Sequence, residues 1–261
     1  MSVLPMHKQE TNNIIELKLV DGKLGVKPEV RYNKDGSIDK RKPNKVAGIS
    51  TEVYPFSEEE IKDLIALFNK RIEEAPDNNK RQIACRNKLM FIIGINSSLR
   101  VSDLASLKWN FFLNNDLTFK DFDKLQPKKT RKSGKFMTFY FNEAVRKIIT
   151  WYINQYPIED MNGYLFKSRK GDKHLTEIAI GRIIKEASIE VGIEKNVCSH
   201  SLRKSFGYHV WHNAQDKEKA LVQLMVILRH SSVATTKHYI GIMDEEVESV
   251  FHDLNLGIDF I

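Results

Sequence analysis

Cysteine is scarce in this chain of 261 residues, which contains only Cys85 and Cys198. Two cysteines so far apart do not form a disulfide framework or a cysteine-based metal cluster, and they fit a reducing compartment. Long apolar runs are missing as well. The most apolar stretch, residues 89–95, is far too short to span a bilayer, and the N-terminus is polar where a signal peptide needs an apolar core. We therefore expect a cytoplasmic protein without a membrane segment.

Several patterns of catalytic and cofactor-binding proteins are also lacking. The sequence has no internal repeat, no glycine-rich phosphate loop and no set of His, Cys and carboxylate residues with metal-ligand spacing. We therefore predict no cofactor and no metal. Positive charge is in excess, because 41 Lys and Arg face 34 Asp and Glu, a net +7. This favours a polyanionic partner, nucleic acid first, although a basic protein without such a partner has the same composition.

The first 54 residues differ in composition from the rest. Residues 1–50 hold ten Lys and Arg against six Asp and Glu, with turn signals at Asp21-Gly22 and Asp35-Gly36. Residues 14–20 and 26–32 fit short strands of a hairpin, and the alternative is a solvated, partly disordered extension. We assign residues 1–54 to a basic N-terminal extension and residues 55–261 to one compact domain with an apolar C-terminal tail.

Helical periodicity dominates the compact part. Ser57 and Glu60 form a capping-box pattern before an apolar stripe, and residues 80–96 are apolar enough for a buried helix. Residues 117–125 and 136–141 have the composition of strands. The fold is therefore predicted to be mainly α-helical with a small antiparallel β-sheet. Further helices are expected after Asn142, from Thr176 to about Gly192, and over residues 200–212, 217–228 and 244–254.

Polar and basic residues concentrate in a few short stretches. Arg100 lies in a polar turn after the buried helix, where Asp103 is placed to brace it, although an ordinary capping turn with a surface arginine explains this stretch by itself. His200 and Arg203 are three residues apart and share a face of a helix. Five of the eight residues 128–135, at the tip of the predicted hairpin, are basic and suit phosphate contacts, although charge runs are often simply solvated. Farther on, His230 precedes Tyr239 by nine residues.

If these stretches converge, their chemistry suits a phosphodiester. Two guanidiniums can hold the two non-bridging oxygens and stabilise the charge that develops at phosphorus. A tyrosine hydroxyl can attack the phosphorus and form a phosphotyrosine. A lysine can protonate the leaving oxygen, and a histidine can take the proton of the tyrosine.

These motifs resemble those of the tyrosine recombinase (phage integrase) family over about residues 55–255. Leu99-Arg100-Val101-Ser102-Asp103 is similar to the family's first arginine box, and Pro127-Lys128-Lys129-Thr130 resembles its hairpin lysine motif. His200-Ser201-Leu202-Arg203 matches its His-x-x-Arg, and Leu228-Arg229-His230 followed by Thr235-Thr236-x-x-Tyr239 matches its last segment. The catalytic residues that the resemblance implies are Arg100, Lys129, His200, Arg203, His230 and Tyr239.

The resemblance implies a site-specific DNA recombinase that cleaves and rejoins DNA through a covalent 3′-phosphotyrosine, without a metal. Its implied partners are double-stranded DNA, further copies of the chain in a dimer or tetramer, and an accessory DNA-bending protein. A bacterial or phage-encoded protein is expected. Lys132 and Lys135 are alternatives to Lys129 as the general acid. Candidate DNA-contacting residues are Lys128, Arg131, Lys132, Lys135, Lys204 and Arg229.

Some features depart from the family pattern. Arg229 stands where glycine is usual, Ser98 stands where glycine is frequent, and residues 1–54 are too few for the family's helical core-binding domain. These departures keep an alternative open, a DNA-binding regulator with the recombinase fold and no strand-transfer activity. A telomere resolvase or a type IB topoisomerase is a further alternative. His209, His212 and His238 lie off the motifs and are assigned to scaffold or surface.

Overall fold

The computed structural model describes residues 18–20, 23–25, 52–128, 134, 136–169 and 171–242. The chain divides into two units, Met1–Ser50 and Thr51–Ile261. In the first unit, β1 (Lys18–Val20) pairs antiparallel with β2 (Lys23–Gly25). β1 falls within the predicted strand 14–20. β2 precedes the predicted strand 26–32, whose residues, like those of the predicted helix 244–254, are outside the described ones.

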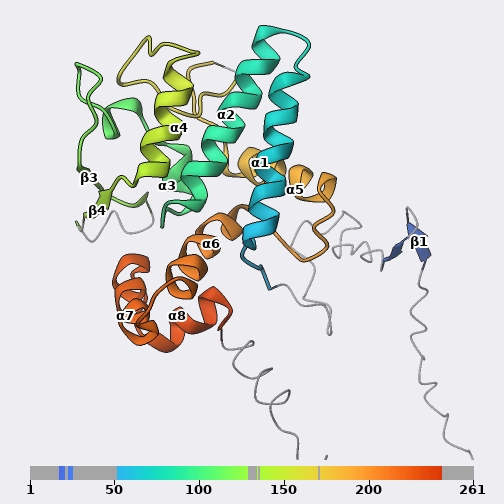
Figure 1. The fold of residues 1–261 in the computed structure, drawn as a ribbon, viewed down its shortest axis with the longest axis vertical. Helices are drawn as coiled ribbons and strands as arrows, with labels where there is room; N and C mark the ends of the chain where they lie inside the picture. The colour runs from blue at the N-terminus through green and yellow to red at the C-terminus, as the bar shows by residue number, and fades with distance from the viewer. Residues whose placement is uncertain are drawn as a thin grey trace, which may run out of the picture. The chain divides into compact units, whose positions relative to one another are not determined.

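The second unit is mainly helical (Figure 1). α1, α2 and α4 pack side by side, and α6 runs from this body to the pair α7 and α8. No helix of the described residues is long and apolar enough to cross a membrane. In chain order, the elements are α1 (Glu58–Glu73), α2 (Asn78–Ile95), α3 (Val101–Ala105), the 3-10 helix η1 (Trp109–Phe111), β3 (Phe122–Leu125), β4 (Met137–Tyr140), α4 (Glu143–Ile153), α5 (Glu177–Glu190), α6 (Ser199–His212), α7 (Lys217–Leu228) and α8 (Val233–Ile240).

Side-chain caps fix where most of these helices begin. At α1 the predicted capping box is present, because the Glu60 amide donates to Ser57 Oγ at 3.2 Å and the Ser57 amide donates to Glu60 Oε2 at 2.7 Å. Each such cap satisfies a backbone N–H that has no partner within the helix. The other helices with Ser, Thr, Asp or Asn caps are α2 (Asp77), α4 (Asn142), α5 (Thr176), α7 (Asp216) and α8 (Ser232).

The small sheet of this unit is the predicted hairpin. β3 and β4 pair antiparallel with Leu125 opposite Met137, so residues 126–136 connect them. The predicted strand 136–141 is confirmed, but the predicted strand 117–125 is too long. Thr118 donates its amide to Asp116 Oδ1 at 3.0 Å and Leu117 has a φ of 64°, so a turn occupies these residues and the strand begins only at Phe122.

α6 belongs to two hydrophobic cores. Leu202, near its N-terminus, is 2% exposed and packs in the large core formed with α1, α2, α4 and α5. Phe206 and Val210, farther along, pack on a smaller core of α7 and α8 that includes Leu224 and Ile240. The helix therefore fixes α7 and α8 relative to the main body, and the candidate site lies where the two cores meet along it.

Candidate active site

Arg203 connects three stretches that are distant in sequence. The side chain, in the first turns of α6, is 5% exposed. Its Nη1 donates to the carbonyl of Ser98, just before α3, and its Nη2 donates to the carbonyl of Leu228 at 2.9 Å, at the end of α7. These acceptors lie 105 and 25 residues away in sequence. One guanidinium therefore ties the start of α3 and the end of α7 to the start of α6.

Arg100 adds a second guanidinium to this place. It is the half-buried N-cap residue of α3, two residues after the carbonyl that Arg203 binds. Burial lowers the pKa of Arg203, the charge of Arg100 lowers it further, and Tyr239 opposes both effects. The described hydrogen bonds of Arg203 use two of its five N–H donors. The pair therefore has the charge and the donors to hold an anion such as a phosphate.

Tyr239 projects from α8 into the same site. Its hydroxyl oxygen is buried and has no hydrogen-bond partner among the described residues. Burial raises the pKa of this phenol, and the charges of Arg203 and Arg100 act against that rise. The tyrosine is therefore protonated at neutral pH. It needs a base before it can act as a nucleophile, and two positive charges are close enough to stabilise its anion.

His230 lies beside that tyrosine and can act as a base. The two rings lie edge to face, with their centroids 4.9 Å apart. His230 Nδ1 lies 3.1 Å from Thr236 Oγ1, and the Thr236 hydroxyl is within 3.3 Å of the carbonyl of Ser232, to which it can donate. In the tautomer with the proton on Nδ1, Nε2 is the acceptor. Burial, then the charges of the two arginines, lowers the pKa of His230, so the ring is neutral at pH 7.

His200 occupies the first turn of α6 but is exposed. Its neighbour in space is Cys198, the N-cap residue, whose Sγ accepts from the His200 amide at 3.4 Å. The hydrogen bond to Cys198 raises the pKa of His200, and the negative charge of the Cys198 thiolate raises it further, while partial desolvation of the ring and the charge of Arg203 act against that rise. Burial alone would raise the pKa of Cys198, but the hydrogen bonds and charge of His200 lower it. The composition indicated no role for this cysteine.

The hairpin connection is described only near its ends. Lys128 is exposed, and its amide donates to Asp103 Oδ1 at 2.9 Å. Arg100 is the N-cap residue of α3, as the interpretation of this stretch as a capping turn expects. The buried carboxylate of Asp103 accepts the Lys128 amide, and no ion pair between Asp103 and Arg100 is present among the described residues. The predicted general acid and the other basic residues of the tip lie outside the described residues and stay predictions; they are Lys129, Arg131, Lys132 and Lys135.

Two predicted DNA contacts have intramolecular partners here. Lys204 is 8% exposed; its Nζ lies 3.6 Å from Glu52 Oε1 and 5.7 Å from the centre of the Tyr239 ring. Arg229 is half-buried and its Nη2 donates to the carbonyl of Phe136 at 2.7 Å. Their contacts to DNA stay predictions, whereas the structure shows both side chains bound to the protein around the site.

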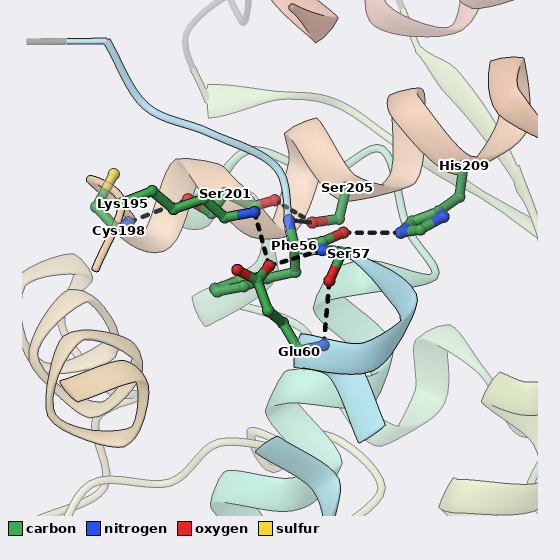
Figure 2. A network of polar contacts seen from close by, with 8 residues as sticks. All are labelled: Phe56, Ser57, Glu60, Lys195, Cys198, Ser201, Ser205 and His209. Atoms are coloured by element: carbon green, nitrogen blue, oxygen red, sulfur yellow. Dashed lines mark hydrogen bonds and ion pairs between the residues drawn. The ribbon is translucent and has the colours of Figure 1, made fainter. Parts of the chain in front are cut away.

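An extended segment before α1 lies along α6 (Figure 2). We call residues 52–57 the strap. The Phe56 amide donates to Ser205 Oγ and the Phe56 carbonyl contacts His209 Nε2, both at 2.8 Å. Glu60 at the start of α1 forms a 2.7 Å ion pair with Lys195, which precedes α6. The sequence analysis assigned His209 to scaffold and did not predict the strap. The strap contacts α6 through the backbone amide and carbonyl of Phe56, and every residue except proline has both groups, so no residue type marks the contact.

The described residues contain no cluster of three or more His, Cys, Asp or Glu that could hold a metal ion. The site is built from two arginines, a neutral histidine and a half-buried tyrosine whose hydroxyl is covered. These groups can bind a phosphate, take a proton from the phenol and stabilise the resulting oxyanion.

Solved structures with a similar fold are recombinases. The crystal structure of XerA recombinase superposes with a TM-score of 0.54 at 24% identity, covering 78% of this chain and 66% of that chain. XerH site-specific recombinase bound to palindromic difH substrate gives a TM-score of 0.54 at 17% identity, covering 84% and 60%. The fold is therefore that of a tyrosine recombinase catalytic domain, as predicted.

Sequence comparisons identify the family. The sequence model of the phage integrase family matches residues 56–246, so the chain belongs to this family. The probable integrase/recombinase YoeC of Bacillus subtilis is 34% identical over 168 residues, which cover 64% of this chain and 83% of YoeC. The tyrosine recombinase XerC of Halalkalibacterium halodurans is 25% identical over 71% of this chain. The match spans 60% of the length of that XerC.

Proposed function

We propose that this chain is the catalytic part of a site-specific DNA recombinase that cuts and rejoins DNA through Tyr239. The observation that carries the proposal is the convergence of Tyr239, His230 and Arg203 in one partly buried site. His230 has an acceptor nitrogen beside the tyrosine, and Arg203 and Arg100 supply positive charge to the same hydroxyl. Family membership supports the same activity.

The substrate proposed is duplex DNA. The net charge of +7 favours a polyanion, and paired guanidiniums fit the non-bridging oxygens of a phosphodiester. Among similar folds, one XerH structure holds a difH substrate, and a lambda integrase dimer is bound to a core site. These are properties of those proteins, and they motivate the substrate proposed here.

The proposed reaction needs no metal or nucleotide. The Tyr239 oxygen attacks the phosphorus, its proton passes to His230 Nε2, and the bond from phosphorus to the 5′ oxygen breaks. Lys129 donates the proton that the leaving 5′ oxygen takes up. The DNA is then joined to the enzyme as a 3′-phosphotyrosine, and the reverse attack by a 5′ hydroxyl rejoins strands and restores the phenol.

The resting site protects its nucleophile. The Tyr239 hydroxyl is covered by protein, so α8 has to shift before the oxygen reaches a phosphate in line. α8 has eight residues and packs on the small core rather than the large one, so a shift leaves the main body intact. We propose that binding of DNA and of further copies of the chain drives this shift, with residues 1–54 acting as a basic arm.

A covalent trapping experiment tests this function. The protein is incubated with nicked duplexes tiled across the DNA that flanks its own gene, and denaturing gels resolve covalent adducts. Tyr239→Phe should abolish the adduct without unfolding the protein, because it removes one hydroxyl and keeps the ring that packs on the small core. Tyr140→Phe, at a tyrosine that is 75% exposed, is the matched control and should retain it. A specific complex in native gels without any adduct would indicate the regulator alternative instead.

A further inference from the structure

We propose that a cavity apart from the candidate active site binds a nucleotide, with its phosphate held by Arg86. The cavity has a volume of about 620 Å³ and lies between the first half of α2, the start of η1 and the loop that connects α4 to α5. The described residues that line it include none of the candidate catalytic residues. Binding at this cavity is a property separate from strand cleavage and goes beyond the proposed function.

Arg86 is a buried charge in the wall of the cavity. It is 8% exposed, and its hydrogen bonds go to neutral groups, the carbonyl of Lys167 at 2.7 Å and the amide oxygen of Asn87 at 2.9 and 3.3 Å. Buried charges are normally paired with an opposite charge, but no carboxylate of the described residues forms an ion pair with Arg86. Its bonds use three of five N–H groups, so charge and donors remain for an anion.

The acidic side chains of the cavity act on Lys167 rather than on Arg86. Asp172 Oδ1 lies 2.8 Å from Lys167 Nζ. The hydrogen bond and the charge of Asp172 raise the pKa of Lys167, and the charges of Glu159 and Asp160 add to that rise. Lys167 contacts Arg86 only through its backbone carbonyl among the described hydrogen bonds. The carboxylates therefore compensate the lysine and leave the charge of the arginine uncompensated.

Arg169 adds a second positive charge near Arg86. It lines the cavity and its side chain is exposed. Burial lowers the pKa of Arg86, Tyr152 acts against this, and the charge of Arg169 lowers the pKa further. Guanidiniums match the oxygens of a phosphate in a planar fork, and an anion placed between two of them relieves their repulsion. We therefore assign the phosphate of the ligand to this part of the cavity.

Aromatic rings line the same cavity. Trp109 stacks on Tyr152 with ring centroids 5.7 Å apart, Tyr156 lies 5.5 Å from Tyr152, and Tyr164 also lines the cavity. Such rings favour a planar, largely apolar ligand group, and the volume falls within the range of small-ligand sites, about 300–1,000 Å³. A planar ring joined to a phosphate is the chemistry of a nucleotide, either free or at the unpaired end of a DNA strand.

Isothermal titration calorimetry with the full chain tests this site. The probes are adenosine and thymidine 5′-monophosphates, the two nucleosides without phosphate, and inorganic phosphate. A hydrogen bond to a charged group is worth about ten-fold in affinity or more, so each nucleotide should bind at least about ten-fold more tightly than its nucleoside. Equal affinities of nucleotide and nucleoside overturn the phosphate position at Arg86. Equal affinities of nucleotide and phosphate overturn the role of the aromatic rings, and no binding of either nucleotide overturns the proposal altogether.

Two exposed arginines form a matched pair of variants. Arg169 lines the cavity, whereas Arg182 lies on α5 outside it with a side chain that is 71% exposed. Arg169→Glu should weaken nucleotide binding by about ten-fold or more and leave nucleoside binding unchanged, and Arg182→Glu should change neither. Equal weakening by both variants shows general attraction to a basic protein and overturns the site. Arg86→Lys keeps the charge without the fork and should also weaken binding; if that variant does not fold, the exposed pair still decides.

Nuclear magnetic resonance locates the bound nucleotide. Trp109 lines the cavity, and Trp211 packs on the small core beside α7 and α8. The indole N–H signal of Trp109 should shift on titration with nucleotide while that of Trp211 stays, and the reverse pattern overturns the location. A single-stranded oligonucleotide with a 5′ phosphate separates the two sources of the ligand. If it displaces the mononucleotide from the cavity, the ligand is the end of a DNA strand; if it binds elsewhere, the ligand is a free nucleotide.

Discussion

Gly207 sets how closely α8, the helix of the proposed nucleophile Tyr239, approaches α6. A Cβ added at Gly207 would lie 2.7 Å from Ile240 Cγ2, which is far inside ordinary contact distance. Ile240 is fully buried and follows Tyr239 directly on α8, and its Cγ2 is a branch next to the backbone rather than a flexible end. In Gly207→Ala the relief must therefore come from a displacement of α8.

The cost of Gly207→Ala follows from two opposing terms. Overpacking of a buried contact costs about 1–3 kcal/mol, and replacing glycine by alanine within a helix returns about 1 kcal/mol. The net loss of stability is thus about 0–2 kcal/mol, a fall in thermal midpoint of up to about 8 °C. Adduct formation should suffer more, because a shift of Tyr239 by up to about 1 Å costs as much as 100-fold.

Calorimetry and single-turnover adduct formation measure these two effects. Gly181→Ala is the matched control, because its Cβ would meet only Ser199 Oγ at 3.9 Å, and it should stabilise α5 without slowing the reaction. Introducing Gly207→Ala into an Ile240→Ala background should cost little, since the clashing methyl is gone. A Gly207→Ala protein with the wild-type rate of attachment would refute the argument that this contact positions the nucleophile.

Three further predictions concern separate groups. The rate at which Tyr239 attaches to DNA should fall as the pH drops through a value below 6.5, because protonated His230 cannot accept the proton of the phenol. Single-turnover rates measured over about pH 5–8 should no longer show this fall at low pH in His230→Gln, and an unchanged fall would exclude His230 as the base. At neutral pH, iodoacetamide should modify Cys198 well before Cys85, because the pKa of Cys198 is lowered, whereas burial raises the pKa of Cys85. If mass spectrometry finds Cys85 modified first, the surroundings of the two thiols differ from those described here. Ser205→Ala should destabilise the fold by about 1–3 kcal/mol in urea unfolding, because the buried amide of Phe56 in the strap loses its acceptor. Ser188→Ala should cost less, because the Ser188 hydroxyl donates to a carbonyl of its own helix, and equal losses would show that the strap contact contributes little.

The sequence was a good guide where local chemistry decides the structure. The capping pair Ser57 and Glu60 marks the start of α1, and Thr176 marks that of α5, because a side-chain cap depends on residues only three apart. α8 was not predicted, although Ser232 caps it and Gly241 follows it. The helix is only eight residues long, and it packs on both α6 and α7, which no local pattern encodes.

The convergence of the site could be predicted only in part. The spacing of His200 and Arg203 predicts a shared helix face, but the structure joins the distant segments through backbone carbonyls, at Ser98 and Leu228. Every residue has such a carbonyl, so its use as an acceptor has no signature in the sequence. Asp103 is a further example, because its carboxylate accepts the backbone amide of Lys128.

Arg229 shows a local conflict that the sequence pattern alone does not reveal. Its backbone lies in the left-handed region at the end of α7, where a Cβ is unfavourable and glycine is the usual residue. The hydrogen bonds of this turn are those that a glycine would make, so the end of the helix does not depend on the side chain. The side chain instead reaches another part of the fold, where its Nη2 donates to the carbonyl of Phe136 at 2.7 Å. Such a contact has no signature in the sequence, because its acceptor is again a backbone carbonyl.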